Sequence, residues 1–388
     1  MTGSVLFHIG SVYVTVYGLS CALSLAAMIS LALLLQKGSS NAIPEKKLLS
    51  FFLCALPTAR ILSRAAYCAF SPELYAGRPL AALLFTEGGG VLTAALIGFV
   101  LAALVYSRKH RVSLGALLDA VAPGLLILAA ALKLTETVPG ETLGQITSSR
   151  LFRSPVFTAA DAIGNARYAV SRWEGILSAI ALAYGVWATL ESRNQKNVSA
   201  PGSVFSGCAA LYCAFQIPLE ALRDGMYPRV GKMPISLILA ALSLLALLAA
   251  DARRLWKTDV NKRYIFLRFV PGAIALIAAL RPGQFDAAAS AAARFLSWLL
   301  PAIAVYAHFS LTAALNRRLR AAKKAEPEKS EPAVSESKTP AKKTDAAPVS
   351  NSDDENTLAA YIARNAKAAS PDDPDSAKIE TPLGLDEP

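Results

Sequence analysis

The stretch TEGGGVLTAALIGFVLAALVY, residues 86–106, decides the fold. It is apolar from Val91 onward, and a helix that crosses a bilayer needs ~20 mostly apolar residues. Its entrance holds Glu87, Gly88, Gly89 and Gly90. Glycines let another backbone or a ligand approach closely, and an acid at membrane depth suggests a site because its burial is costly. The alternative for the glycines is that they serve tight helix packing alone.

The composition is that of a membrane protein. Of 388 residues, 54% are hydrophobic and 17% are charged, and the mean hydropathy is positive. The net charge of +11 does not indicate nucleic-acid binding, because membrane proteins gather Lys and Arg on cytoplasmic loops facing anionic lipid. The five cysteines lie in or beside apolar runs without metal-ligand spacing, and the three histidines lie apart. We therefore expect no metal site.

The apolar runs predict an all-α polytopic membrane protein with nine spans, of which the last two have the weaker pattern. We expect spans at 11–35, 48–70, 86–106, 113–134, 174–190, 202–222, 233–250, 264–280 and 292–315. The predicted parts are a membrane domain at 1–252 with an outer loop or head region at 135–173, a C-terminal helical hairpin at 253–315, and a disordered, charged cytoplasmic tail at 316–388. The tail contains too few large apolar residues to fold alone.

Basic residues predict the orientation in the membrane. The turn SRKHR, residues 107–111, and the segment DARRLWKTDVNKR, residues 251–263, are typical of cytoplasmic loops. With nine spans this places the N-terminus outside and the tail inside. Asp119 follows the first basic turn closely, and we expect it to pair with one of the basic residues of SRKHR.

This orientation gathers charged and polar residues near the outer leaflet. They are Arg60, Arg64, Glu87, Lys133, Glu136, Gln216, Glu220 and Arg223. Arg suits phosphate because its guanidinium group is planar and bidentate. We therefore predict a polar cavity that holds an anionic lipid headgroup. The alternative is that these residues form interhelical ion pairs or extend to the membrane interface.

Five segments carry a resemblance to a known family. They are FHIGSVYVTVYGL (7–19), ARIL (59–62), PLAALLFTEGGGVLTAALIG (79–98), LLDAVAP (117–123) and GSVFSGCAALYCAFQIPLEALRD (202–224). In order and spacing they resemble motifs of the bacterial prolipoprotein diacylglyceryl transferases, with Tyr212, Glu220 and Arg223 in register in the last segment. The resemblance covers about residues 5–250.

The resemblance implies a seven-span enzyme of the bacterial cytoplasmic membrane. Such an enzyme transfers the diacylglyceryl group of phosphatidylglycerol to a cysteine thiol of a lipoprotein precursor, and glycerol phosphate leaves. This chemistry requires cations for the phosphate and a thiolate as the nucleophile. It implies no metal or cofactor, and its partners are phosphatidylglycerol, lipoprotein precursors and other membrane lipids.

The chain departs from the family pattern at several positions. Thr93 replaces a His and Gln216 replaces an Arg, while Lys133 stands for an Arg and Glu136 for an Asn. Threonine cannot act as a base near neutral pH, whereas histidine can. A family motif ending in Leu-Tyr-Glu is reduced to SRWEG, residues 171–175, which retains a glutamate.

Three hypotheses remain open. The chain is an active but divergent transferase, an inactive family member that binds lipid or lipoprotein, or a transporter of lipids or small molecules; the hydropathy pattern shows no internal repeat, which disfavours transport. The candidate catalytic residues are Thr93, Lys133, Tyr212 and Gln216. The candidate substrate-binding residues are Arg60, Glu87, Gly88, Gly89, Glu136, Glu220 and Arg223.

Overall fold

The structure is a computed structural model, and it describes part of the chain. The described residues are 5–9, 12–37, 42–75, 77, 89–136, 143–147, 154–161, 163–193, 199–224, 229–230, 233–258, 260–280 and 291–325. All of them belong to one unit, residues 1–330. Glu87 and Gly88 lie outside the described residues, as does the chain beyond residue 325.

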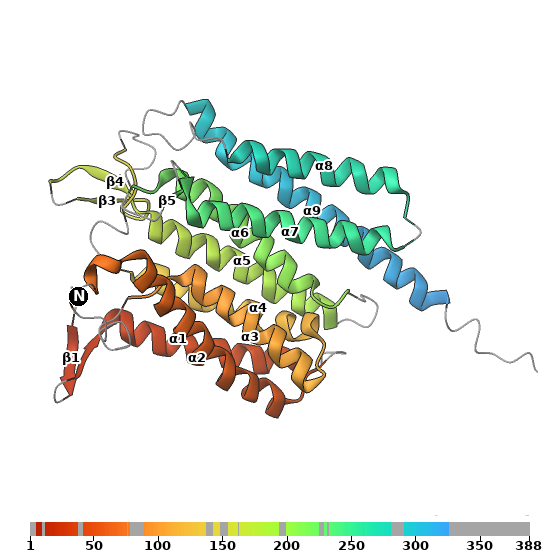
Figure 1. Ribbon diagram of the computed structural model, residues 1–388, viewed down its shortest axis with the longest axis horizontal. Helices are drawn as coiled ribbons and strands as arrows, with labels where there is room; N and C mark the ends of the chain where they lie inside the picture. The colour runs from red at the N-terminus through yellow and green to blue at the C-terminus, as the bar shows by residue number, and fades with distance from the viewer. Residues whose placement is uncertain are drawn as a thin grey trace, which may run out of the picture. The chain divides into compact units, whose positions relative to one another are not determined.

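Long helices make up most of the described chain (Figure 1). They are α1 (Val16–Gln36), α2 (Glu45–Phe70), α3 (Leu92–His110), α4 (Leu114–Thr135), α5 (Val170–Arg193), α6 (Ser203–Leu222), α7 (Ile235–Trp256), α8 (Lys262–Ala279) and α9 (Ala291–Ala325), with a 3-10 turn η1 (Pro72–Leu74) after α2. The all-α polytopic class predicted from the apolar runs is confirmed.

Eight of the described helices are long and apolar enough to cross a membrane. They are α1 to α7 and residues 295–321 of α9. The eighth predicted span, at 264–280, corresponds to α8, which does not belong to this set. At 18 residues α8 is just long enough, but it carries three basic residues, Lys262, Arg263 and Arg268. Each such charge is costly at membrane depth.

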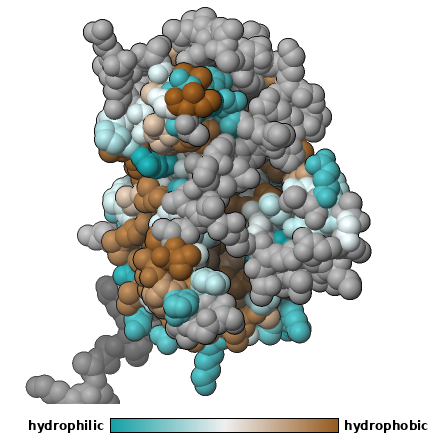
Figure 2. All heavy atoms as spheres, turned by 90° about the vertical axis from the view of Figure 1, so that its left-hand side faces the viewer, coloured by the Kyte–Doolittle hydropathy of each residue, from teal (hydrophilic) through white to brown (hydrophobic). Residues whose placement is uncertain are grey.

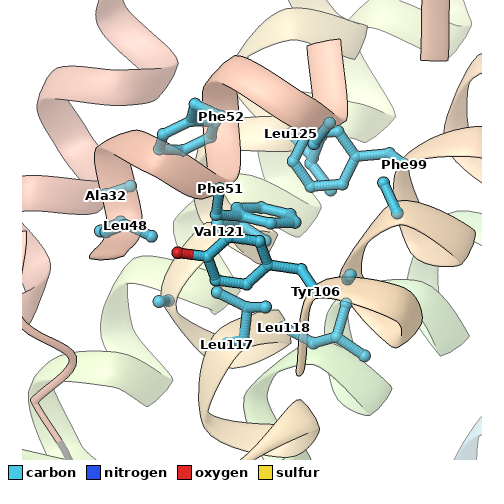
Figure 3. Close-up of a cluster of buried hydrophobic side chains, with 14 of the residues drawn as sticks. Ala32, Leu48, Phe51, Phe52, Phe99, Tyr106, Leu117, Leu118, Val121 and Leu125 are labelled. Carbon is cyan, nitrogen blue, oxygen red and sulfur yellow. The ribbon is translucent and has the colours of Figure 1, made fainter. Parts of the chain in front are cut away.

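Neighbouring helices pack side by side through small and aromatic residues. The first four form one group, in which α1 contacts α4 and α2 contacts α3, and α5 joins it through α4. The rings of Phe51, Phe99 and Tyr106 meet in its core, with the Phe51 centroid 5.2 Å and 5.5 Å from the other two (Figure 3). The Tyr106 hydroxyl donates to the Lys47 carbonyl over 2.7 Å. This core therefore fixes α3, the helix that contains the opening apolar stretch.

A second group of helices follows α5 along the chain. α6 contacts α5, α7 and α9, while α8 and α9 pack against each other. In Figure 1, α8 and α9 run along α7. The α8–α9 pair is therefore an integral layer of the described bundle rather than a detached hairpin.

Asp119 caps α6 instead of pairing with the basic turn. Its carboxylate accepts hydrogen bonds from the backbone amides of Gly202, at 2.6 Å, and Phe205, at 2.8 Å. Amides in the first turn of a helix have no partner within the helix, and a carboxylate there satisfies them. The predicted pairing of Asp119 with the turn SRKHR is therefore wrong.

Three short hairpins lie at one end of the bundle (Figure 1). They are β1–β2 (Val5–Ile9 and Val12–Thr15), β3–β4 (Thr158–Ala160 and Ala166–Tyr168) and β5–β6 (Arg229–Val230 and Met233–Pro234). Each is antiparallel and leads directly into a helix: α1, α5 or α7. We call this the hairpin end. Figure 2 looks onto it and shows hydrophilic and hydrophobic residues interspersed.

Candidate functional site

Glu174 is the centre of a buried polar cluster near the hairpin end. Its side chain is 4% exposed. Oε1 accepts hydrogen bonds from the Tyr212 hydroxyl, at 3.1 Å, and from Gln216 Nε2, at 2.8 Å. Oε2 accepts from Arg223 Nη2 at 3.0 Å and lies 3.4 Å from Lys133 Nζ. One carboxylate thus joins side chains from three helices and from the end of α6.

Two further carboxylates share the same cations. Lys133 Nζ lies 3.0 Å from Glu136 Oε2, and Arg223 Nε lies 3.2 Å from Glu220 Oε1. With Glu174 this makes three carboxylates against two cations, a formal sum of −1 for these five described side chains. Both cations are therefore engaged by acids of the protein, and an anionic ligand has to compete with them.

Helix geometry explains why the α6 residues meet. Tyr212, Gln216 and Glu220 are spaced four residues apart, and residues i and i+4 lie on the same face of a helix. That face packs against α5, which carries Glu174 just after its first turn, and α4 supplies Lys133 from its last turn. The cluster is therefore a product of three adjacent helices.

A short extended segment, residues 143–147, holds the cluster from outside the helices. Gly144 forms a bridge with Arg223, and Ile146 forms one with Arg167 in β4. The segment thus lies between the strand that leads into α5 and the end of α6. A Cβ at Gly144 would clash with the Leu222 carbonyl and lie 2.7 Å from Val170 Cγ2, so only glycine fits this approach.

A family model described as prolipoprotein diacylglyceryl transferase matches residues 4–250. The chain belongs to the prolipoprotein diacylglyceryl transferase family. The match includes α1 to α6 and most of α7, and therefore all the residues of the Glu174 cluster.

Relatives named phosphatidylglycerol–prolipoprotein diacylglyceryl transferase align with part of the chain. The protein of Bacillus cytotoxicus is 31% identical over 123 residues, which is 32% of this chain and 45% of the relative. The protein of Halalkalibacterium halodurans is 30% identical over 113 residues, which is 29% of this chain and 39% of the relative. The protein of Listeria monocytogenes is 32% identical over 123 residues, which is 32% of this chain and 44% of the relative. The chain thus spans less than half the length of these transferases.

Six of the candidate residues of this family member come together. They are Lys133, Glu136, Tyr212, Gln216, Glu220 and Arg223. The structure does not join Thr93 to them: it lies in the first turn of α3, and among the described residues no hydrogen bond or ion pair connects it with the cluster. Glu87 and Gly88 lie outside the described residues.

Arg60 and Gly89 form a separate contact at the start of α3. Arg60 Nη1 donates to the Gly89 carbonyl at 3.2 Å. Gly89 has φ of 75°, and a Cβ there would clash with the Tyr67 ring. A Cβ at Gly90 would lie 2.7 Å from Ser63 Oγ. The glycines therefore allow the segment before α3 to pack closely on α2.

Tyr17, in α1, lies near residues of both groups. Its phenol is near enough to Glu136, Lys133 and Arg60 for electrostatic interaction with each of them.

Glu174 itself is absent from the candidate residues proposed from the sequence. The only signal was the glutamate retained in SRWEG. The structure shows how this motif is fixed: Trp173 Nε1 donates to the Phe157 carbonyl at 3.2 Å, and the two rings contact each other at a tilt of 31°, with centroids 4.5 Å apart. The tryptophan thus ties the start of α5 to the hairpin β3–β4, and Glu174 points into the bundle.

Proposed function

We propose that the protein transfers the diacylglyceryl group of phosphatidylglycerol to the cysteine thiol of a lipoprotein precursor. The observation that carries the proposal is the buried cluster of Lys133, Arg223 and Tyr212 around Glu174, in a chain of the transferase family. The names of the relatives specify phosphatidylglycerol and prolipoprotein as their substrates. Buried cations at the end of a membrane bundle suit a phosphate headgroup.

The roles follow from the charge that develops in the reaction. The thiolate sulfur forms a bond to the glyceryl carbon while the carbon–oxygen bond to phosphate breaks, and glycerol phosphate leaves with that electron pair. Lys133 and Arg223 stabilise the departing phosphate, since charge-assisted hydrogen bonds are worth about 1.5–3 kcal/mol each. Tyr212 donates to Glu174 and orients it.

Glu220 is the candidate acceptor for the thiol proton. Its Oε1 lies beside Arg223 Nε, whereas its buried Oε2 has no hydrogen-bond partner among the described residues. An unpaired buried acceptor is costly, and a substrate thiol or hydroxyl would satisfy it. Glu220 therefore offers a proton acceptor in a chain that has Thr93 at the position of the family's His.

The second candidate function is lipid or lipoprotein binding without transfer. It is favoured by the engagement of both cluster cations with protein carboxylates. A headgroup phosphate then exchanges with Glu136 or Glu174 and is held, but no base completes the reaction. Thr93 and Gln216 agree with this alternative.

Complementation separates the two functions. The protein is expressed in a bacterium depleted of its own transferase, and a reporter lipoprotein is followed by gel mobility and by incorporation of labelled phosphatidylglycerol. We expect lipidation above the empty-vector level that is lost in Lys133→Ala and Arg223→Ala. The control is Lys109→Ala, at the opposite end of the bundle. Inserted, stable protein without lipidation overturns the transfer, and retention of labelled phosphatidylglycerol that depends on Lys133 then supports binding alone.

The proposed setting is the bacterial cytoplasmic membrane, with the hairpin end on the outer side. Lipoprotein precursors present their cysteine at that surface, and the basic residues of the turn SRKHR lie at the other end. Labelling of an engineered cysteine at Ile163, in the exposed β3–β4 turn, by a membrane-impermeant maleimide on intact spheroplasts tests the orientation. Protection of Ile163→Cys until the membrane is permeabilised overturns it.

A further inference from the structure

Arg167 links three separate segments of the chain at the hairpin end. It lies in β4, and its Nε donates to Asp161 Oδ2 at 2.9 Å. Its Nη1 donates to Asp224 Oδ2 at 2.8 Å and to the Gly144 carbonyl at 3.3 Å. One guanidinium group therefore connects the β3–β4 turn, the segment 143–147 and the residue that follows Arg223.

The backbone pairing around Arg167 leads to both partners of the buried ion pair. Gly144 N donates to the Tyr168 carbonyl at 2.6 Å, and Gln145 N donates to the Leu222 carbonyl at 2.8 Å. The residues after Tyr168 enter α5 and reach Glu174, while Arg223 directly follows Leu222. The separation of Glu174 and Arg223 is thus set by the extended segment that lies between them.

Arg223 needs such support because it lies beyond the end of α6. Its backbone is extended, with φ of −73° and ψ of 131°, so the helix does not fix it. A free arginine side chain has about 2 kcal/mol of rotamer entropy, which opposes a single geometry. The backbone of Arg223 is held by its bridge to Gly144 and by the hydrogen bond from Arg167 to the next residue, Asp224. Both contacts restrict the position from which the Arg223 side chain extends.

The ion pairs of Arg167 are not themselves a large source of stability. The Asp224 side chain is 55% exposed, and exposed pairs contribute about 0–1 kcal/mol. What Arg167 contributes is geometry, because one planar group bonds two carboxylates and a carbonyl at once. Lysine has the charge but not the fork.

We propose that Arg167 is a positioning residue that aligns Arg223 with Glu174 by fixing the segment 143–147 between α5 and α6. The expected effect of Arg167 on activity rests on the proposed function, in which Arg223 binds the phosphate of the lipid. Arg167 touches no member of the Glu174 cluster through a hydrogen bond or ion pair among the described residues, so it acts through the backbone.

A double-mutant cycle between Arg167→Ala and Arg223→Ala tests the proposal. It is measured on thermal unfolding of the purified full-length protein in detergent. Since Arg223→Ala is expected to abolish lipidation, a second cycle on lipidation of the reporter uses Arg223→Lys. We expect Arg167→Ala to reduce lipidation about tenfold in the native background but less than about twofold in the Arg223→Lys background. In the unfolding cycle, we expect the double variant to lose no more in Tm than the larger single loss.

Matched variants separate positioning from loss of fold. Arg167→Lys retains one ion pair and is expected to restore part of the lipidation. Arg172→Ala is the control, since this neighbouring arginine bonds the Pro155 carbonyl and is expected to leave both readouts unchanged. If Arg223→Ala does not insert, Arg223→Lys replaces it in the unfolding cycle, because it retains the charge that Glu174 requires.

The lipidation cycle and the unfolding cycle together distinguish an error in the role of Arg167 from an error in the proposed function. Additive losses in Tm overturn the positioning role, as does native-level lipidation in Arg167→Ala while Arg223→Ala has lost it. If the native protein lipidates nothing, the proposed transfer fails, and the unfolding cycle alone decides the role of Arg167.

Discussion

Arg223 Nη2 lies 3.0 Å from Glu174 Oε2, and both side chains are almost fully buried. The two residues are 49 positions apart: Glu174 lies in α5, and Arg223 directly follows α6. Removing two charges from water costs several kcal/mol each, and their attraction offsets this only with good geometry and further hydrogen bonds. Tyr212, Gln216 and Lys133 complete that set of partners around the carboxylate.

Glu174→Ala is therefore expected to destabilise the protein strongly. The change removes the carboxylate that faces both Lys133 and Arg223, and breaking buried pairs in this way costs about 3–5 kcal/mol of unfolding free energy. Thermal unfolding in detergent measures the loss. Glu191→Ala, at the exposed far end of the same helix, serves as the control and is expected to stay within about 0.5 kcal/mol. Equal stability of the two variants would contradict the central role of Glu174.

Gln216→Arg is expected to increase lipidation, alone or together with Thr93→His. The substitution adds a cation beside Glu174 Oε1 and changes the formal sum of the cluster, with residue 216 included, from −1 to 0. The larger side chain costs about 1–3 kcal/mol through overpacking, so protein level has to be measured alongside activity. Lipidation per inserted molecule in the complementation strain is the measurement. A drop below the native level would show that the added cation does not assist the phosphate.

Glu220→Gln is expected to lower the rate of lipidation more than the binding of phosphatidylglycerol. Glutamine has nearly the same volume but cannot accept the thiol proton, while the phosphate-binding cations remain. Rates with a reporter lipoprotein at increasing lipid concentration separate kcat from KM. A change confined to KM would assign Glu220 to binding alone.

Acidification is expected to loosen the β3–β4 turn. The Arg167 guanidinium bonded to Asp161 lowers the pKa of that carboxyl from 3.8 to about 2. Since the pKa is lowered in the folded state, the stabilisation is complete above about pH 4 and is lost as the pH falls through about 2. Hydrogen exchange at the amides of Ile163 and Asn165, which donate to Asp161 Oδ1, is the measurement after correction for intrinsic rates.

An Asp161→Asn variant provides the comparison for this pH dependence. It retains the shape of the turn but has no carboxyl group to titrate. Its exchange is expected to change little between pH 4 and pH 2, roughly the range in which Asp161 protonates. An equal rise in exchange in both proteins would assign the effect to another group.

The contact between α7 and α9 depends on buried polar residues. His308 is fully buried, and its Nδ1 lies 3.1 Å from Asp251 Oδ2, which also accepts from the Thr312 hydroxyl at 2.6 Å. Asp251→Ala is expected to cost about 3–5 kcal/mol, because it removes the carboxylate that faces both His308 and Thr312, and His308→Ala is expected to cost less, because Asp251 retains the hydrogen bond from Thr312. The double change to Leu is expected to cost less than either. Thermal unfolding with α9 proteolysis as a second readout tests this, and simple additivity would refute it.

The sequence predicted the helices better than the hydrogen bonds and ion pairs around Glu174. Apolar runs and family-like motifs located the helices. The sequence did not select Glu174, because its motif is reduced to SRWEG and its partners lie far away in the chain: Lys133 precedes it, and Tyr212 and Arg223 follow it by 38 and 49 residues. Asp119 was misassigned for the same reason: basic neighbours in sequence suggested an ion pair, while the distant start of α6 provided the actual partners.

The absence of the eighth predicted span, at 264–280, from the set of apolar spanning helices also has a physical explanation. Hydropathy alone makes the run at 264–280 apolar, but α8 begins with Lys262 and Arg263 and contains Arg268. The Arg268 guanidinium lies over the rings of Tyr264 and Tyr306, 5.7 Å and 5.3 Å from their centroids. One ring from α8 itself and one from α9 thus accommodate a charge that an average hydropathy counts only as a penalty.

Asp251 is the first residue beyond the family match, and its partners His308 and Thr312 lie nearly 60 residues later. A shortened chain that ends after α7 would turn this carboxylate toward lipid tails with nothing to neutralise it. The buried carboxylate of Asp251 and the side chains of α9 that contact it therefore depend on each other for stability. Thus α7, most of which belongs to the shared domain, depends on a helix that lies beyond that domain.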